Sequence, residues 1–158
     1  MLPSELRAMM ERLKEVQVKL PERIVWPTDT VEYLDLSALG NQSRVALVPN
    51  PSYTFEIFLQ VIPPGGHTDR HRHYNETLHY ILSGSGYSEV EGVTAAWKAG
   101  DLVYTPPWAW HRHFNSGSET VRILGIENSR LLDRIGGLNR RVSEAAKEPP
   151  GEAPDFSR

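Results

Sequence analysis

The sequence predicts an all-β domain of the sandwich or barrel kind, and three observations support this prediction. Short runs rich in β-branched and aromatic residues recur between residues 31 and 128, and Gly, Pro and Asn interrupt them about every 8 to 12 residues. No long helical pattern separates these runs, so alternating βαβ units are not expected. The chain has 158 residues, which is the size of one domain with short extensions and is enough to bury a core without disulfides.

The first element is a helix, predicted over residues 4–19. Ser4 suits the N-cap position, and apolar residues follow at the i, i+3, i+4, i+7 spacing of an amphipathic helix. Its apolar face comprises Leu6, Met9, Met10, Leu13 and Val16 or Gln17. The preferred interpretation is that this helix packs on its own domain, and the alternative is an arm that forms a dimer. Pro21 and Pro27 end the helical pattern, so residues 1–30 are predicted to be an N-terminal helix and arm.

Residues 31–128 are predicted to form the barrel, and residues 129–158 a C-terminal segment. Within the barrel, eight runs have the composition of β-strands. They span residues 31–36, 44–49, 53–63, 77–82, 86–92, 94–101, 102–107 and 120–128. Beyond them, residues 129–147 are predicted to form one or two short helices, and the Pro-rich, polar residues 148–158 are predicted to be disordered.

The composition excludes several classes of protein. The chain has no cysteine, which excludes a disulfide scaffold, a cysteine zinc site and thiol catalysis. Its 17 basic and 20 acidic residues give a net charge of −3 without a basic stripe, so no nucleic-acid partner is expected. No apolar run approaches the ~20 residues of a membrane helix, and the N-terminus lacks the apolar core of a signal peptide. A cytoplasmic protein without a membrane partner is therefore predicted.

The six histidines are the most informative residues, because all of them lie between residues 67 and 113. Side chains of a strand alternate between its two faces. His71 and His73 therefore point the same way, as do His111 and His113, while the arginine within each pair points the opposite way, to solvent. Two imidazoles from one strand and one from a neighbouring strand can meet at one metal ion. Three protein ligands leave positions open for a substrate, which indicates a catalytic rather than a structural site.

The spacing of these residues resembles the two motifs of the cupins. The first motif is matched by Gly65, His71, His73 and Gly84, and the second by Gly100, Pro106, His111 and Asn115. The resemblance covers residues 50–128. It implies a double-stranded β-helix, the jelly-roll barrel of the cupins, with a metal ion inside near one mouth. The metal ligands that it implies are His71, His73 and His111.

Glu76 departs from the cupin pattern. The usual glutamate ligand of the family should fall at Thr77, whereas the glutamate of this chain lies one position earlier. A shift of one residue turns a strand side chain to the opposite face, unless a bulge intervenes. The favoured interpretation is a three-histidine site with Glu76 outside it, and the alternative is a fourth ligand at Glu76. His79 shares the parity of His73, so it is a candidate for an additional ligand or base, or for the pocket wall.

Trp108 stands where the common cupin motif has glycine, within the segment PPWAWHRHFN at residues 106–115. This segment resembles gentisate 1,2-dioxygenases and their salicylate and hydroxynaphthoate relatives, whose iron is held by three histidines. The resemblance implies a non-haem Fe(II) dioxygenase that uses O2 to cleave a ring or C–C bond of a small hydroxylated aromatic or related chelating substrate. Fe(II) is the preferred cofactor, although imidazole ligands leave Zn, Ni, Mn and Cu open.

His113 is the candidate catalytic residue. It would act as an acid–base group or as a hydrogen-bonding partner of a substrate oxygen, and the alternative is a structural histidine. Trp108, Trp110 and Tyr104 are candidates for the wall of the substrate pocket, where a tryptophan would stack on an aromatic ring. No arginine of this region stands out as an anchor for a substrate carboxylate.

Two other functions remain open on the same scaffold. One is a metal-dependent lyase or isomerase of a small carboxylic acid, in which Glu76, His79 or a tyrosine removes a proton. The other is a non-catalytic cupin that binds a small molecule. A homodimer is expected from the family resemblance and from strand edges that need cover.

Overall fold

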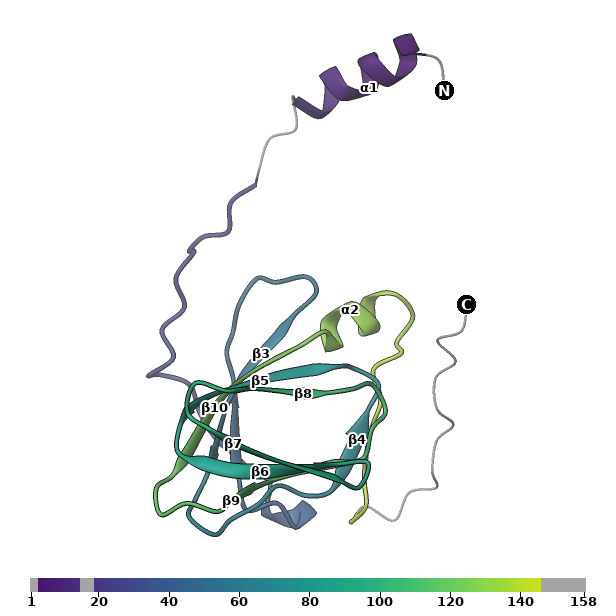
Figure 1. The fold of residues 1–158 in the computed structure, drawn as a ribbon. Helices are drawn as coiled ribbons and strands as arrows, with labels where there is room; N and C mark the ends of the chain where they lie inside the picture. Colours follow the sequence, from purple (N-terminus) through teal and green to yellow (C-terminus); the bar gives the residue numbers. More distant parts are fainter. Residues whose placement is uncertain (1–2, 15–18, 146–158) are drawn as a thin grey trace.

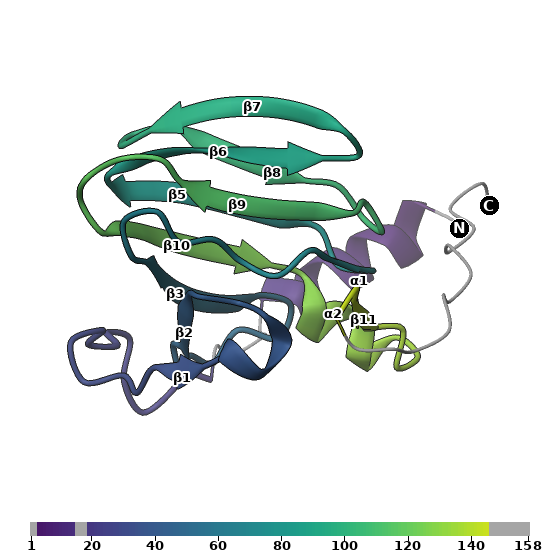
Figure 2. The same ribbon diagram turned by 90° about the horizontal axis from the view of Figure 1, so that it is seen from below.

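The computed structural model describes residues 3–14 and 19–145, and it shows two antiparallel β-sheets packed face to face (Figure 1 and Figure 2). The predicted all-β class is therefore confirmed. The six-stranded sheet has the order β1–β2–β3–β10–β5–β8, and the five-stranded sheet has the order β11–β4–β9–β6–β7. Strands that are distant in the sequence thus lie side by side, which is the jelly-roll arrangement.

Each of the eight predicted runs contains a strand, and the two histidine segments supply two more. The strands of the six-stranded sheet are β1 (Leu34–Asp35), β2 (Arg44–Leu47), β3 (Glu56–Ile62), β10 (Val121–Glu127), β5 (Thr77–Ser83) and β8 (Leu102–Thr105). Those of the five-stranded sheet are β11 (Arg141–Ser143), β4 (His71–His73), β9 (His111–Asn115), β6 (Ser85–Val90) and β7 (Val93–Lys98). A short 3-10 helix, η1 (Ser37–Leu39), connects β1 to β2.

The space between the sheets is divided between an apolar core and a polar cavity. The core consists of Ile62, Ile81, Trp97, Val121 and Ile123. On β3, β5 and β10 the core residues lie toward one end of the strand, and side chains of the same face line the cavity toward the other end. The strand alternation therefore gives each of these central strands two functions, one in folding and one at the cavity.

Gly125 lies on β10 between the core and the cavity. A Cβ atom at this position would collide with the ring of Phe58, which lines the cavity from β3. The two residues are directly paired across the strands. Only glycine at this position lets the aromatic ring lie against the sheet.

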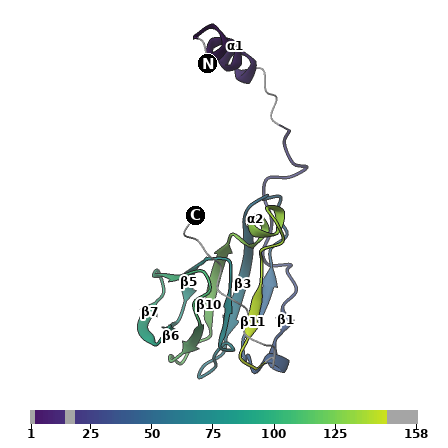
Figure 3. The ribbon, with the colours of Figure 1, turned by 90° about the vertical axis from the view of Figure 1, so that its right-hand side faces the viewer.

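The N-terminal helix, α1 (Pro3–Lys14), is shorter than predicted and does not pack as expected. The side chains of residues 3–12 are all exposed, and the helix lies away from the barrel (Figure 1 and Figure 3). The preferred interpretation, that it packs on its own domain, is therefore wrong for this structure. Residues 15–18 of the predicted helix lie outside the described residues, and the chain is no longer helical at residues 19 and 20.

The C-terminal segment contains one of the predicted helices and one strand that was not predicted. Helix α2 (Ser129–Arg134) follows β10 directly. Where a second helix was considered, Arg141–Ser143 instead form β11, which pairs with β4. The five-stranded sheet thus includes a strand beyond residue 128, where the barrel was predicted to end. The predicted disordered tail at residues 148–158 lies outside the described residues.

Membrane-spanning helices were not expected from the sequence. Neither helix in the described ranges, residues 3–14 and 19–145, combines the length and the hydrophobicity that crossing a bilayer requires.

Candidate metal centre

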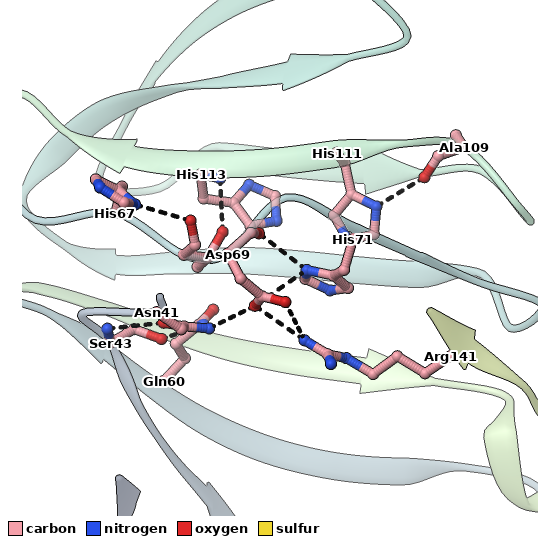
Figure 4. Close-up of polar contacts among 11 residues, drawn as sticks. Asn41, Ser43, Gln60, His67, Asp69, His71, Ala109, His111, His113 and Arg141 are labelled. Carbon is pink, nitrogen blue, oxygen red and sulfur yellow. Dashed lines mark hydrogen bonds and ion pairs between the residues drawn. The ribbon is translucent and has the colours of Figure 1, made fainter. Parts of the chain in front are cut away.

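Three histidines from two neighbouring strands meet between the sheets, and Figure 4 shows two of them, His71 and His111. His71 and His73 come from β4, and His111 comes from β9 directly opposite His71. One ring nitrogen of each residue lies within 4.8 Å of those of the other two. The ring centroid of His111 is 4.2 Å from that of His71 and 4.7 Å from that of His73. The predicted triad is therefore brought together, and its geometry suits a single metal ion.

A backbone carbonyl fixes the orientation of each of the three rings. Nδ1 of His71 lies 3.0 Å from the carbonyl oxygen of Asp69. The corresponding distances are 2.7 Å from His73 to Asn75 and 2.8 Å from His111 to Ala109. A carbonyl oxygen only accepts hydrogen bonds, so each Nδ1 carries the proton and donates it. The lone pair of each Nε2 is then free for a metal ion, as in established histidine–metal sites.

Burial keeps His73 and His111 neutral. Desolvation, with the charge of neighbouring His71, lowers the pKa of His73 to about 3. Desolvation, followed by the charges of His71 and His73, also lowers the pKa of His111 well below its ordinary value. Neutral imidazole is the form that binds a metal ion, so no proton has to leave these two residues near neutral pH.

Asp69 supports His71 from outside the triad. Its buried carboxylate accepts hydrogen bonds from Asn41 at 2.8 Å and from Nη2 of Arg141 at 2.9 and 2.8 Å, and it lies 3.4 Å from Nδ1 of His71 (Figure 4). Burial would raise the pKa of Asp69, but the hydrogen bond and charge of His71, together with Arg141, outweigh it and hold the pKa well below the usual range. The sequence did not single out Asp69 or Arg141, because the pairing of β11 with β4 has no local signal.

His113 and His79 form a second pair of rings deeper in the same cavity. Their centroids are 4.5 Å apart, and both residues are buried. The inward orientation predicted for His79 is thus observed, but His79 is not part of the cluster at ligand distance. Desolvation, and then the charge of His71, lowers the pKa of His79 to about 4.

Ser88 anchors the ring of His113. Its Oγ accepts a hydrogen bond from Nε1 of Trp97 at 2.8 Å and lies 2.7 Å from Nδ1 of His113. A hydroxyl has one proton and two acceptor positions, so Ser88 can serve either tautomer of the imidazole. Nε2 of His113 is buried and has no hydrogen-bond partner among the residues described. His113 therefore presents an unused ring nitrogen inside the barrel.

The cavity in front of the triad has a volume of about 340 Å³, which is within the range of small-molecule sites. One wall is apolar and is formed by Leu36, Leu39, Val45, Leu47 and Phe58. The five-stranded sheet opposite carries His71, His73, His111 and His113, and polar groups from β3, β5, β10 and the C-terminal segment, His79 of β5 among them, complete the lining. The cavity thus combines an apolar surface for a flat ring with a small number of polar contacts.

Glu76 lies outside the cavity, as the favoured interpretation stated. It is exposed, accepts a hydrogen bond from the hydroxyl of Tyr104 at 3.1 Å, and has no part in the histidine cluster. Thr77 occupies the buried, cavity-lining position next to it. The one-residue shift has therefore turned the glutamate to the opposite face of β5. Tyr104 is on that outer face as well, so its proposed role in the pocket wall is wrong.

Trp108 and Trp110 also lie outside the cavity, contrary to the sequence-based interpretation. The guanidinium carbon of Arg72 lies 4.2 Å from the ring centroid of Trp108 and 4.7 Å from that of Trp110. Arg72 points away from the triad, so the tryptophans cover the outer face of β4. Arg72 was expected to point into solvent, but it is half-buried beneath the two tryptophans.

Comparisons with known proteins agree with the fold. Residues 58–127 match the family described as Cupin domain. The chain is 32% identical over 90 residues to a 5-aminosalicylate 1,2-dioxygenase of Comamonas sp., an alignment that covers 57% of this chain and 24% of that enzyme. It is 33% identical over 110 residues to a gentisate 1,2-dioxygenase of Haloferax sp., which covers 65% of this chain and 30% of the relative. The chain therefore spans about a quarter to a third of the length of these curated relatives.

A salicylate 1,2-dioxygenase from Pseudaminobacter salicylatoxidans has a similar structure. It superimposes with a TM-score of 0.61 at 18% identity, over 92% of this chain and 51% of that one. At this level of identity the similarity shows a shared fold.

Proposed function

The chain contains a cupin domain and is a distant relative of gentisate and salicylate 1,2-dioxygenases, and on this premise we propose that it is a metal-dependent dioxygenase. Its substrate would be a small hydroxylated aromatic acid or a related chelating compound, and Fe(II) would be its cofactor. The observation that supports this proposal is the triad of inward-facing imidazoles with free Nε2 lone pairs.

Three neutral ligands leave a divalent metal ion with its full charge. The cluster at ligand distance contains no carboxylate among the described residues. An anionic substrate with two adjacent oxygen atoms, such as a phenolate beside a carboxylate, is attracted to such a centre. When bound, Fe(II) would supply a Lewis acid and a site for O2.

The residues of the chain hold and orient the substrate. The apolar wall around Phe58 receives the ring and excludes water from it. With its proton on Nε2, His113 donates a hydrogen bond to an oxygen of the substrate, and no other group in the described part of the chain hydrogen-bonds to this nitrogen. Such a donor, fixed by Ser88 and Trp97, stabilises negative charge on that oxygen without reorganisation.

A lyase or isomerase is less well supported. Glu76, one of the residues considered as its base, is exposed on the outer face of the six-stranded sheet, as is Tyr104, the tyrosine that was considered for the pocket wall. Of the bases considered from the sequence, His79 is the one that lines the cavity. A non-catalytic binding protein would use the same cavity and is distinguished by the absence of turnover.

Oxygen consumption tests the proposal directly. Protein loaded anaerobically with Fe(II) is mixed with salicylate, gentisate or 1-hydroxy-2-naphthoate in an oxygen electrode. We expect one O2 to be consumed for each molecule of substrate, with both oxygen atoms found in the ring-opened product. Product that forms under anaerobic conditions would instead indicate a lyase or isomerase. Metal-loaded protein that binds these acids without turnover would indicate a binding protein.

A further inference from the structure

Glu127 is a carboxyl group in the cavity wall that the histidine cluster does not use. It is the last residue of β10, and it lines the same cavity as His73 and Phe58. It is not among the residues at ligand distance in the triad. A carboxyl group at this depth in a cavity is costly to desolvate, so its presence requires compensating contacts.

Two neighbouring side chains hold the carboxyl group in place. Nδ2 of Asn75 donates to Oε2 at 2.9 Å, and Oγ1 of Thr77 donates to the same oxygen at 3.4 Å. Thr77 is paired with Glu127 across β5 and β10, so the backbone register fixes the relation of these residues. Asn75 is also tied to the metal centre, because its carbonyl oxygen accepts the Nδ1 proton of His73.

The arrangement leaves Glu127 with hydrogen-bonding capacity for a ligand. Asn75 and Thr77 both donate to Oε2, and a carboxylate has about four acceptor positions on its two oxygens, so a position remains beside the further hydrogen bond from Ser129. Burial raises the pKa of Glu127, and the nearby charge of Glu56 raises it further. Hydrogen bonds from Ser129, Asn75 and Thr77 lower this pKa but do not cancel the increase. The carboxyl group is therefore poorly solvated, and a hydrogen bond from a ligand compensates part of that cost.

We propose that Glu127 determines substrate specificity by accepting a hydrogen bond from a hydroxyl or amino group on the ring, remote from the two oxygens that chelate the metal ion. This inference rests on the proposed function, since it assumes an aromatic acid in the cavity. A ring with an acceptor-only substituent at that place meets the carboxylate unfavourably.

Four salicylates that differ only at one ring position provide the probes. Gentisate and 5-aminosalicylate carry a donor there, salicylate carries hydrogen, and 5-nitrosalicylate carries acceptors alone. Dissociation constants are measured anaerobically with metal-loaded protein by calorimetry at pH 8, which favours the ionised carboxyl group. The substituent also changes the acidity of the chelating hydroxyl, but this effect is common to wild type and variant. The informative quantity is therefore the change in preference between the two proteins.

Glu127→Gln is the decisive variant, because its side-chain oxygen can keep the bond from Asn75 while its NH2 group faces the ligand. We expect the preference for gentisate and 5-aminosalicylate over 5-nitrosalicylate to fall by about tenfold or more, since a charged acceptor is replaced by a donor. Salicylate should bind both proteins equally. Glu56→Gln is the matched control, because Glu56 is paired with Glu127 but is not part of the cavity lining, and it should leave all preferences unchanged.

The outcomes separate the inference from the proposed function. If the four acids bind to the wild type and Glu127→Gln leaves the ratios of their dissociation constants unchanged, the role of Glu127 is overturned and the proposed function stands. If none of the four acids binds to metal-loaded wild type, the proposed function is overturned and the inference with it. A change in preference for Glu56→Gln equal to that for Glu127→Gln would also overturn the assignment, because it would reflect charge near the cavity and not contact.

Discussion

At the scale of the residue, the backbone positions His111 more than other side chains do. It is almost completely buried, and its Nδ1 donates to the carbonyl oxygen of Ala109, two residues earlier. The strand alternation of β9 then directs its Nε2 toward the same point as those of His71 and His73. Removal of this imidazole should therefore remove a ligand without loosening the hydrogen-bond network of the barrel.

We expect His111→Ala to lose stoichiometric metal while the barrel remains folded. Two imidazoles do not satisfy the coordination of a divalent ion that three can hold. Metal content is measured by elemental analysis after loading and gel filtration, and folding by circular dichroism. Glu76→Gln is the matched control, because Glu76 is exposed and should retain the metal content of the wild type. Full metal content in His111→Ala, or its loss in Glu76→Gln, would show that the ligand set is wrong.

Residue-scale prediction from the sequence succeeded where the chain is regular and failed where it is not. Alternation placed His71, His73 and His79 on the inner face and Glu76 on the outer face. Trp108 was placed in the pocket wall for its aromatic ring and not by alternation, and its φ of 61°, in the left-handed region, marks a break in the regular chain before β9. The common cupin glycine at this position suits that φ. Here the contacts of Trp108 with Arg72 and Tyr74 compensate for the strain.

At the scale of the element, β11 shows the limit of sequence-based prediction. It has only three residues, and it exists because β4 offers an edge to which it can pair. Tertiary pairing of this kind has no signature in local composition. The strand matters to the site, because it carries Arg141 to the carboxylate of Asp69. By contrast, the longer strands β3, β5 and β10 were predictable from their β-branched and aromatic residues.

We expect Arg141→Met to destabilise the fold by about 2 kcal/mol at pH 7, because it leaves the buried carboxylate of Asp69 without its cation. This value is at the low end for a broken buried pair, since Arg141 itself is partly exposed. Urea unfolding of the variant and wild type measures the difference. Arg140→Met is the matched control, because its exposed side chain has no contact with Asp69 and should leave stability unchanged.

The pH dependence follows from the depressed pKa of Asp69. Because its pKa is lower in the folded than in the unfolded state, its stabilising contribution is complete above the unfolded value of about 4 and is lost as the pH falls below it. The stability difference between wild type and Arg141→Met should therefore be constant above about pH 5 and shrink as the pH falls below about 4. A difference that stays constant as the pH falls below about 4 would show that Arg141 acts by packing alone.

At the scale of the whole molecule, two apolar surfaces have no partner within the described part of the chain. One is the outer patch of β5 and β8, formed by Leu78, Tyr80, Leu82, Leu102 and Tyr104, which are each 39–60% exposed. Leu78 is paired with Tyr104 and Tyr80 with Leu102, so the patch is continuous across the strands. The other is the N-terminal helix and arm, with Met10, Ile24 and Val25 exposed. Large continuous apolar patches on a protein surface commonly mark an interface with another protein.

We expect the chain to form a homodimer in which the outer patch is buried against the second copy. Multi-angle light scattering of the full chain should give twice the chain mass, and Leu102→Glu should give the monomer mass with an unchanged circular dichroism spectrum. Leu34→Glu is the matched control, because Leu34 is similarly exposed but lies at the opposite edge of the same sheet. A wild type that remains monomeric at about 100 μM, well above ordinary dimer affinities, would contradict this prediction.

The division of β3, β5 and β10 into a core end and a cavity end has a consequence for how such a barrel can diverge. Replacements at Phe58, Gln60, Thr77 or Glu127 alter what the cavity accepts while Ile62, Ile81 and Ile123 keep the sheets joined. The ligand preference of the cavity can thus be changed with little effect on the free energy of unfolding. A combinatorial library confined to the four cavity positions should therefore yield mostly foldable proteins with a wide spread of binding preferences.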